Sequence, residues 1–179
     1  MSSLPFGWLR QAYPHAMPGV LEALEEVCAV EAQLDAPRRL AYFVAQGAIE
    51  TDHYKTLREY GSEERFTRLY GGRKDLGNIQ PGDGARYCGR GLLMTTGRFN
   101  YHKLQQVTGL PVLTSPELLE EPKNGALAAA QYWVWRDCNT YSEKGQFTQL
   151  TKVVNGGYTH LNARRAELAR IWQFLRLEL

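Results

Sequence analysis

One helical segment decides how this chain folds, and it reads Leu40-Ala41-Tyr42-Phe43-Val44-Ala45-Gln46-Gly47-Ala48-Ile49-Glu50-Thr51. The tripeptide Asp35-Ala36-Pro37 precedes it and is a helix start signal, because proline tolerates the first helical turn and aspartate favours the N-terminus. At about 100° per residue, Glu50 falls about 20° from Phe43, on the edge of the apolar face. The segment therefore predicts an apolar helix that ends at a carboxylate.

A second carboxylate, Glu59, follows Glu50 nine residues later. A glutamate that faces a core is costly to ionise, so its pKa rises and it holds a proton near neutrality. Hydrolysis of a glycosidic bond uses one protonated carboxyl group and one ionised carboxylate. On one unbroken helix the two side chains would lie about 13.5 Å apart along the axis and point opposite ways. The helix must therefore end near residues 52–54 for the pair to act together.

Composition places the chain among ordinary globular proteins. Its 179 residues predict one domain with a real core. A net charge of +2 is much weaker than the basic surface of a nucleic-acid-binding protein, and hydrophobic residues make up 44% of the chain. No apolar run approaches the roughly 18 residues of a membrane span. We expect a monomer that binds no nucleic acid and inserts into no membrane.

The cysteines and the N-terminus bear on the cellular compartment. Cys28, Cys88 and Cys138 lack the short spacings of a zinc site or a disulfide framework, so three reduced thiols are expected. The N-terminus has no basic stretch followed by an apolar stretch, which is the pattern of a secretory signal. We expect synthesis in the cytoplasm, with release or delivery if the substrate lies outside.

Helical periodicity also dominates outside the first segment. Further helices are expected over residues 20–31, 99–107, 115–121, 126–136, 146–154 and 161–177, with Asn124 as the cap of the helix over 126–136. From residue 70 to residue 100 the chain is instead rich in glycine, which predicts irregular loops or a short hairpin wrapped around a site. The predicted fold class is mainly α, with one glycine-rich excursion.

Several motifs are similar to those of one enzyme family. Residues 43–51 are similar to a catalytic helix, and Leu57-Arg58-Glu59-Tyr60 is similar to a second carboxylate site. The most specific segment runs from Asp75 to Gly91 and contains Gly77-Asn78-Ile79-Gln80-Pro81-Gly82-Asp83-Gly84, and residues 92–101 continue the match. Later, Asn155-Gly156-Gly157 is followed by Arg164, nine residues after the asparagine. Together these motifs resemble glycoside hydrolase family 19 in its phage-endolysin branch, over about residues 37–165.

The resemblance implies a lysozyme-like, chitinase-like single domain and a set of site residues. Glu50 would be the general acid, and Glu59 would be the general base that activates a water. Thr96 matches a hydroxyl that helps to hold this water. The other matched positions, which line the sugar cleft or brace the acid, are Asn100, Tyr101, Asn155 and Arg164.

The glycine-rich segment raises further expectations. Tyr87 and Tyr101 are the aromatic residues expected to contact sugar, because both lie in the predicted loops. Arg90 is expected to pair with a buried carboxylate and hold the loops near the site. Ile49 and Met94 stand where the family has histidine and glutamine, and a thioether cannot replace the donors and acceptors of an amide.

The implied activity is inverting cleavage of the β-1,4 glycan strands of bacterial peptidoglycan, with no metal or organic cofactor. The implied partner is the peptidoglycan strand, reached in the cell wall or periplasm after release or delivery. We expect a single catalytic domain over residues 1–179, with an N-terminal helical segment (1–36), a core (37–165), a closing helix (166–179) and no separate wall-binding domain.

Three alternatives stay open. A chitinase of the same fold would share both carboxylates, although the endolysin-like segment over residues 77–84 argues against it. A secreted antibacterial toxin with the same activity would be accompanied by an immunity protein. A degenerate glycan-binding protein without turnover is motivated by Ile49 and Met94, while the presence of both Glu50 and Glu59 weighs against it.

Overall fold

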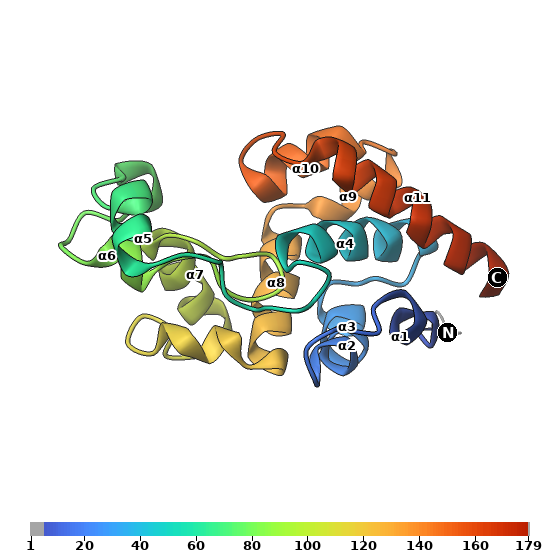
Figure 1. Ribbon diagram of the computed structural model, residues 1–179, viewed down its shortest axis with the longest axis horizontal. Helices are drawn as coiled ribbons and strands as arrows, with labels where there is room; N and C mark the ends of the chain where they lie inside the picture. Colours follow the sequence, from blue (N-terminus) through green and yellow to red (C-terminus); the bar gives the residue numbers. More distant parts are fainter. Residues whose placement is uncertain (1–5, 179) are drawn as a thin grey trace.

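The computed structural model describes residues 6–178, and this part of the chain is built from helices and loops (Figure 1). The elements are, in chain order, α1 (Trp8–Ala12), α2 (Val20–Ala23), the π-helical turn η1 (Leu24–Cys28), α3 (Ala29–Glu31), α4 (Pro37–Glu50), α5 (Glu63–Tyr70), the 3-10 turn η2 (Lys74–Leu76), α6 (Asp83–Arg86), α7 (Arg98–Thr108), the 3-10 turn η3 (Pro116–Glu120), α8 (Pro122–Trp135), α9 (Cys138–Glu143), α10 (Phe147–Asn155) and α11 (Leu161–Glu178). The predicted mainly α fold is confirmed.

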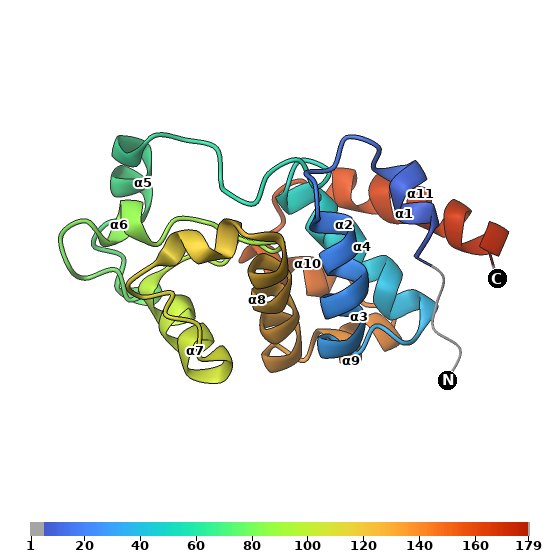
Figure 2. The ribbon, with the colours of Figure 1, turned by 90° about the horizontal axis from the view of Figure 1, so that it is seen from below.

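The helices form two lobes that are joined through α8 (Figures 1 and 2). The large lobe holds α1 to α4 and α9 to α11, and the small lobe holds α5, α6, α7 and η3. Each lobe has its own cluster of buried apolar side chains. One face of α8 supplies Trp133 to the large cluster, and Ala128 on the same helix belongs to the small cluster. This helix therefore fixes the two lobes against each other.

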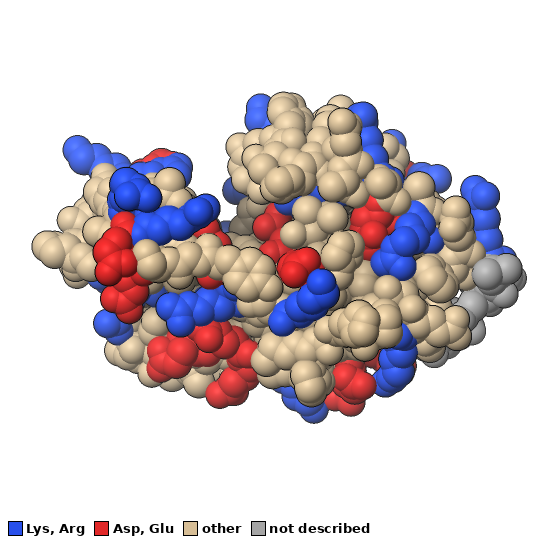
Figure 3. Space-filling model, in the orientation of Figure 1, with Lys and Arg blue, Asp and Glu red and all other residues tan. Residues whose placement is uncertain are grey.

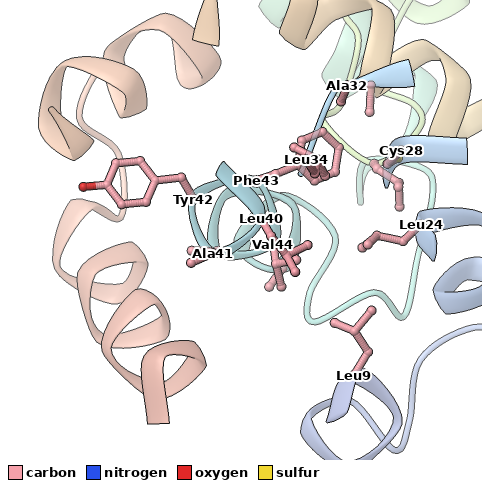
Figure 4. Packing of buried hydrophobic residues seen from close by; sticks show 14 of the residues in the cluster. Leu9, Leu24, Cys28, Ala32, Leu34, Leu40, Ala41, Tyr42, Phe43 and Val44 are labelled. Carbon is pink, nitrogen blue, oxygen red and sulfur yellow. The ribbon is translucent and has the colours of Figure 1, made fainter. Parts of the chain in front are cut away.

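Helix α4 is the centre of the large lobe. It packs against α9, α10 and α11, and its residues from Leu40 to Ala48 are all buried. Figure 4 shows Phe43 and Tyr42 pointing to different sides of the helix. The ring of Phe43 lies 5.0 Å from that of Trp133, and the ring of Tyr42 lies 4.9 Å from that of Phe147. Because Leu40 to Ala48 are buried, packing fixes most of the helix up to the residue that ends it, Glu50.

The chain reverses immediately after α4, as the two carboxylates require. Asp52, His53 and Tyr54 all have left-handed backbone conformations, with φ of 48°, 58° and 65°. The Thr51 hydroxyl donates to the carbonyl of Gly47 at 2.6 Å and accepts the backbone N–H of Tyr54 at 2.9 Å. Left-handed conformations are costly for residues other than glycine, so these hydrogen bonds and the burial of Tyr54 hold the turn in place.

The helix expected over residues 20–31 is one continuous helical run, α2–η1–α3, with a π-helical turn in its middle. The expectation that Asn124 caps α8 is wrong. Glu121 is the N-cap and Pro122 the first helical residue, and Asn124 donates to the Glu121 carboxylate at 2.7 Å. Proline has a φ that suits the first turn, so the cap lies three residues earlier than expected.

The glycine-rich excursion consists of loops with two short helical turns, η2 and α6, and not of a hairpin. Within residues 6–178 the only β-type pairings are two isolated bridges, from Arg90 to Arg58 and to Thr95. The three cysteines are buried free thiols. Nowhere in the described range is a helix both long and apolar enough to cross a membrane. The helices α1, α5, α6 and α9 have no counterpart among the helices expected from the sequence.

The contact between Gly47 and Tyr54 gives a first prediction. A Cβ atom at residue 47 would lie 3.0 Å from the Tyr54 hydroxyl oxygen. Gly47→Ala would normally stabilise a helix by about 1 kcal/mol, but here we expect it to lower the free energy of unfolding. In a Tyr54→Phe background, which lacks that oxygen, the same Gly47→Ala change should be neutral or stabilising.

Urea denaturation of the four proteins in this cycle measures the effect. Tyr54→Phe alone should cost about 1 kcal/mol, because it removes the hydrogen bond of 2.9 Å to the carbonyl of Val44. An equal effect of Gly47→Ala in both backgrounds would show that the close approach of the hydroxyl does not constrain the turn.

Candidate active site

Glu50 and Glu59 line one cleft between the two lobes, with a volume of about 630 Å³. Figure 3 shows this hollow between the small lobe and α10. Its lining residues are Glu50, Glu59, Tyr70, Arg73, Asp75, Leu76, Leu93, Met94, Thr95, Thr96, Asn100, Tyr132, Arg136, Val153, Val154, Asn155 and Gly156. A second hollow of about 460 Å³ on the large lobe is lined by Arg38, Tyr42, Gly145, Trp172 and Arg176, and none of these is a carboxylate. The structure thus brings together the two glutamates that lie on opposite sides of the turn after α4.

Glu50 is enclosed and ion-paired. Its side chain is 13% exposed, and Arg164 Nη2 donates to its Oε1 at 2.6 Å. Burial raises the pKa of Glu50, while the charge and hydrogen bond of Arg164 and a hydrogen bond from Asn155 act in the opposite direction. The net result is a pKa above the ordinary value, because loss of hydration is the largest effect. This carboxyl group can therefore carry a proton at a pH where an exposed glutamate cannot.

Arg164 lies behind Glu50 and not on the cleft surface. It is 1% exposed and is absent from the cleft lining, so a direct contact with substrate is excluded in this structure. Its Nη1 donates to Gln46 Oε1 at 2.6 Å, and Gln46 Nε2 donates to the Thr151 hydroxyl at 2.9 Å. These bonds connect α11, α4 and α10 around Glu50. Of the two roles that the motif implied for Arg164, bracing the acid fits the geometry.

Glu59 has different surroundings. The Tyr70 hydroxyl donates to its Oε1 at 2.8 Å, and the backbone N–H of Gly89 donates to its Oε2 at 3.2 Å. A Cβ atom at residue 89 would lie 3.1 Å from Oε2, so the glycine lets the carboxylate approach the backbone. Both oxygens of Glu59 accept from neutral donors, whereas Glu50 faces a guanidinium in a buried position. The two carboxylates therefore differ in environment, as acid–base hydrolysis requires.

Thr96 and Asn100 lie on the cleft wall, as the motif implied. The Thr96 hydroxyl donates to the carbonyl of Met94 at 2.8 Å. Its one proton is thereby used, so this oxygen can only accept a hydrogen bond from a water. Asn100 Nδ2 donates to the carbonyl of Thr96 at 2.8 Å, which leaves the amide oxygen for other donors. Asn155 lines the opposite wall beside Glu50.

The expectation that Tyr87 and Tyr101 offer their rings to a sugar is corrected by the structure. They are 1% and 0% exposed, and neither lines the cleft. The Tyr101 hydroxyl donates to the carbonyl of Cys88 at 2.9 Å, and the Tyr87 hydroxyl donates to that of Leu113 at 3.1 Å. Both rings belong to the core of the small lobe, where the hydrogen bonds of their hydroxyl groups to backbone carbonyls hold them.

Arg90 is buried and fixes the loops of the small lobe, as expected. Its Nε donates to Glu120 Oε1 at 2.7 Å, and its Nη1 donates to the Tyr101 hydroxyl at 3.2 Å and to the carbonyl of Arg86 at 2.9 Å. The carboxylate partner is only partly buried, with a side chain 33% exposed. Arg90 therefore shapes the wall that carries Thr96 without facing the substrate.

Several cleft residues were not predicted. Tyr70 supports Glu59 from the end of α5, and Tyr132 and Arg136 form part of the acid's wall. A helical pattern places Tyr132 among ordinary core residues, and no local spacing distinguishes Tyr70 from a surface tyrosine. The described residues contain no group of three or more His, Cys, Asp or Glu side chains that could hold a metal ion.

Comparison with known proteins starts from sequence. No protein-family model matches this chain. A curated relative from Haemophilus influenzae, described as a glycosyl hydrolase family 19 domain-containing protein, is 30% identical over 97 residues. The match covers 54% of this chain and 46% of the relative, so it spans about half of each protein.

Solved structures with the same fold include chitinases. A bacterial family 19 chitinase has a TM-score of 0.74 at 17% identity, over 97% of this chain and 95% of that one. Chitinase C from Streptomyces griseus has a TM-score of 0.72 at 20% identity, over 97% and 76% of the two chains. A class IV chitinase from Zea mays has a TM-score of 0.69 at 19% identity, over 98% and 92%. These comparisons confirm the resemblance to glycoside hydrolase family 19, and the chain has the fold of that family's chitinases.

Proposed function

We propose that this chain is an endolysin-type glycoside hydrolase that cleaves the β-1,4 bonds of bacterial peptidoglycan by a single inverting displacement. The observation that carries the proposal is the placement of Glu50 and Glu59 in one cleft, in unlike surroundings. The family 19 fold and the related sequence support a glycoside hydrolase in general. The sequence match spans only about half of the relative. The activity of this chain is therefore proposed and is not transferred from the relative.

In the proposed reaction Glu50 gives its proton to the glycosidic oxygen as the bond to the anomeric carbon breaks. Glu59 takes a proton from a water that attacks the same carbon from the opposite face, so the configuration inverts. The Thr96 hydroxyl accepts a hydrogen bond from this water, because it donates its own proton to the carbonyl of Met94. Arg164 keeps the acid in position throughout, because it is buried and ion-paired with it. No covalent intermediate is formed.

Chitin is the second candidate substrate, because solved structures of the same fold carry the name chitinase. The segment over residues 75–91, which resembles the endolysin branch, favours peptidoglycan. The two substrates share the β-1,4 linkage and differ in their substituents. Product analysis on both polymers distinguishes them.

Digestion of purified peptidoglycan and of chitin, with products identified by mass spectrometry, tests the proposal. The wild-type protein should release new reducing ends from peptidoglycan, and Glu50→Gln and Glu59→Gln should lower the rate by at least about 100-fold. Thr96→Ala should lower it less, because it removes one of several contacts to the water. Glu63→Gln is the matched control, since this carboxylate on α5 is exposed and lies outside the cleft.

The outcomes separate the candidates. Products from chitin alone would favour a chitinase. Undiminished cleavage by Glu50→Gln would refute the assignment of the acid. Binding to peptidoglycan without any product from the folded wild-type protein would favour a glycan-binding protein.

The raised pKa of Glu50 also predicts how stability depends on pH. A group whose pKa is raised on folding contributes stability that is complete below its unfolded pKa of about 4.3 and is lost as the pH rises through the folded pKa. Glutamine does not titrate and keeps the acceptor for Arg164. The stability of Glu50→Gln relative to that of the wild type should therefore increase as the pH rises from about 4 to about 8. Thermal unfolding across this range measures it, and a pH-independent difference would show that the carboxyl group is not destabilised by burial.

A further inference from the structure

The walls of the cleft carry two arginines, Arg73 and Arg136. Arg73 is ion-paired with Asp75, which also lines the cleft. Arg136 is exposed, and no carboxylate of residues 6–176 lies within ion-pair distance of it. Its guanidinium lies 5.8 Å from the centre of the Tyr132 ring. The charge of Arg73 is thus compensated within the protein, while that of Arg136 faces the cleft without a carboxylate partner.

Arg136 belongs to the wall that holds the acid. It directly follows α8, one turn after Tyr132, whose hydroxyl donates to the carbonyl of Val153 at 2.9 Å. This contact ties the end of α8 to α10, which also carries Asn155. The charges of Arg136 and of Glu50 both act on the Tyr132 hydroxyl. The cation and the acid therefore lie on neighbouring parts of one surface.

The other arginines near the site already have carboxylate partners. Arg164 is paired with Glu50 at 2.6 Å, and Arg90 with Glu120 at 2.7 Å. A planar guanidinium is suited to bind a carboxylate through two parallel hydrogen bonds. A neutral sugar offers only hydroxyl and amide groups and leaves the charge uncompensated. The geometry of the cleft thus leaves one cation available to an anionic ligand.

We infer that Arg136 binds a carboxylate carried by a substituent of the glycan strand, so that the cleft prefers anionic over neutral strands. The inference rests on the proposed function, because peptidoglycan strands bear peptides with carboxylates and chitin bears none. It goes further in naming the group that is recognised and the residue that recognises it. Arg136 is a specificity-determining residue in this account and takes no part in proton transfer.

The experiment measures binding to soluble peptidoglycan strands in the Glu50→Gln protein, which should not turn them over. Two forms of the same strands are compared, one native and one with its carboxylates converted to methylamides. Native strands should bind about fivefold more tightly, the size expected of one solvent-accessible ion pair. Adding Arg136→Gln should abolish this preference, and Arg136→Lys should retain part of it because the charge remains. Added salt should reduce the difference in affinity between native and methylamidated strands, because it screens the ion pair.

Arg68→Gln is the matched control, since this arginine on α5 is exposed and lies outside the cleft, and it should leave the preference intact. A preference that survives Arg136→Gln would overturn the inference, as would equal binding of both strand forms or no binding at all. Failure of the proposed function is seen separately, as the absence of new reducing ends when the wild-type protein digests native strands. The two failures are therefore distinguishable.

Discussion

The ion pair between Glu50 and Arg164 is the interaction on which the rest of the site depends. A buried guanidinium is strongly destabilising unless its charge and its donors are satisfied. Arg164 meets this requirement through Glu50, Gln46 and the carbonyl of Thr159. The same bonds fix α11 against α4, so the fold of the large lobe and the position of the acid are set by one group. Burial still outweighs the ion pair in its effect on the pKa of Glu50, so the acid is held in place and remains able to carry a proton.

Glu59 is placed by a second constraint, the left-handed turn over residues 52–54. A continuing helix would carry Glu59 away from Glu50, and the turn instead sends the chain along the small lobe. There the backbone N–H of Glu59 donates to the carbonyl of Gly89 at 2.9 Å, and the N–H of Gly89 donates to the carboxylate of Glu59. The backbone of Gly89 thus holds both the main chain and the carboxylate of Glu59. Helix α8 fixes the small lobe, which carries these groups, relative to Glu50. The cleft geometry follows from these three elements together.

Local signals in the sequence were sufficient for the frame of the site. The proline start of α4 and its apolar face predicted where the helix begins, and the requirement that Glu50 and Glu59 act together predicted that it ends near residues 52–54. The directions of Tyr87 and Tyr101 could not be predicted, because their hydroxyl partners lie 26 and 13 residues away in the chain. A loop position predicts exposure only when no distant partner exists. The hydrogen bond from Tyr70 to Glu59 could not be predicted for the same reason, since this contact exists only after the small lobe has folded.

The proposed role of Arg136 has a consequence for the acid. A cation near a carboxyl group favours its ionised form, and a bound anion cancels that effect. Arg136 and Glu50 line the same cleft, but the cation that acts most strongly on Glu50 is the buried Arg164. A substrate carboxylate at Arg136 would therefore leave the ion pair of Glu50 in place and compensate only the exposed cation. Recognition of an anionic strand and the strength of the acid would then depend on two different arginines, and a neutral polymer in the same cleft would leave the charge of Arg136 uncompensated.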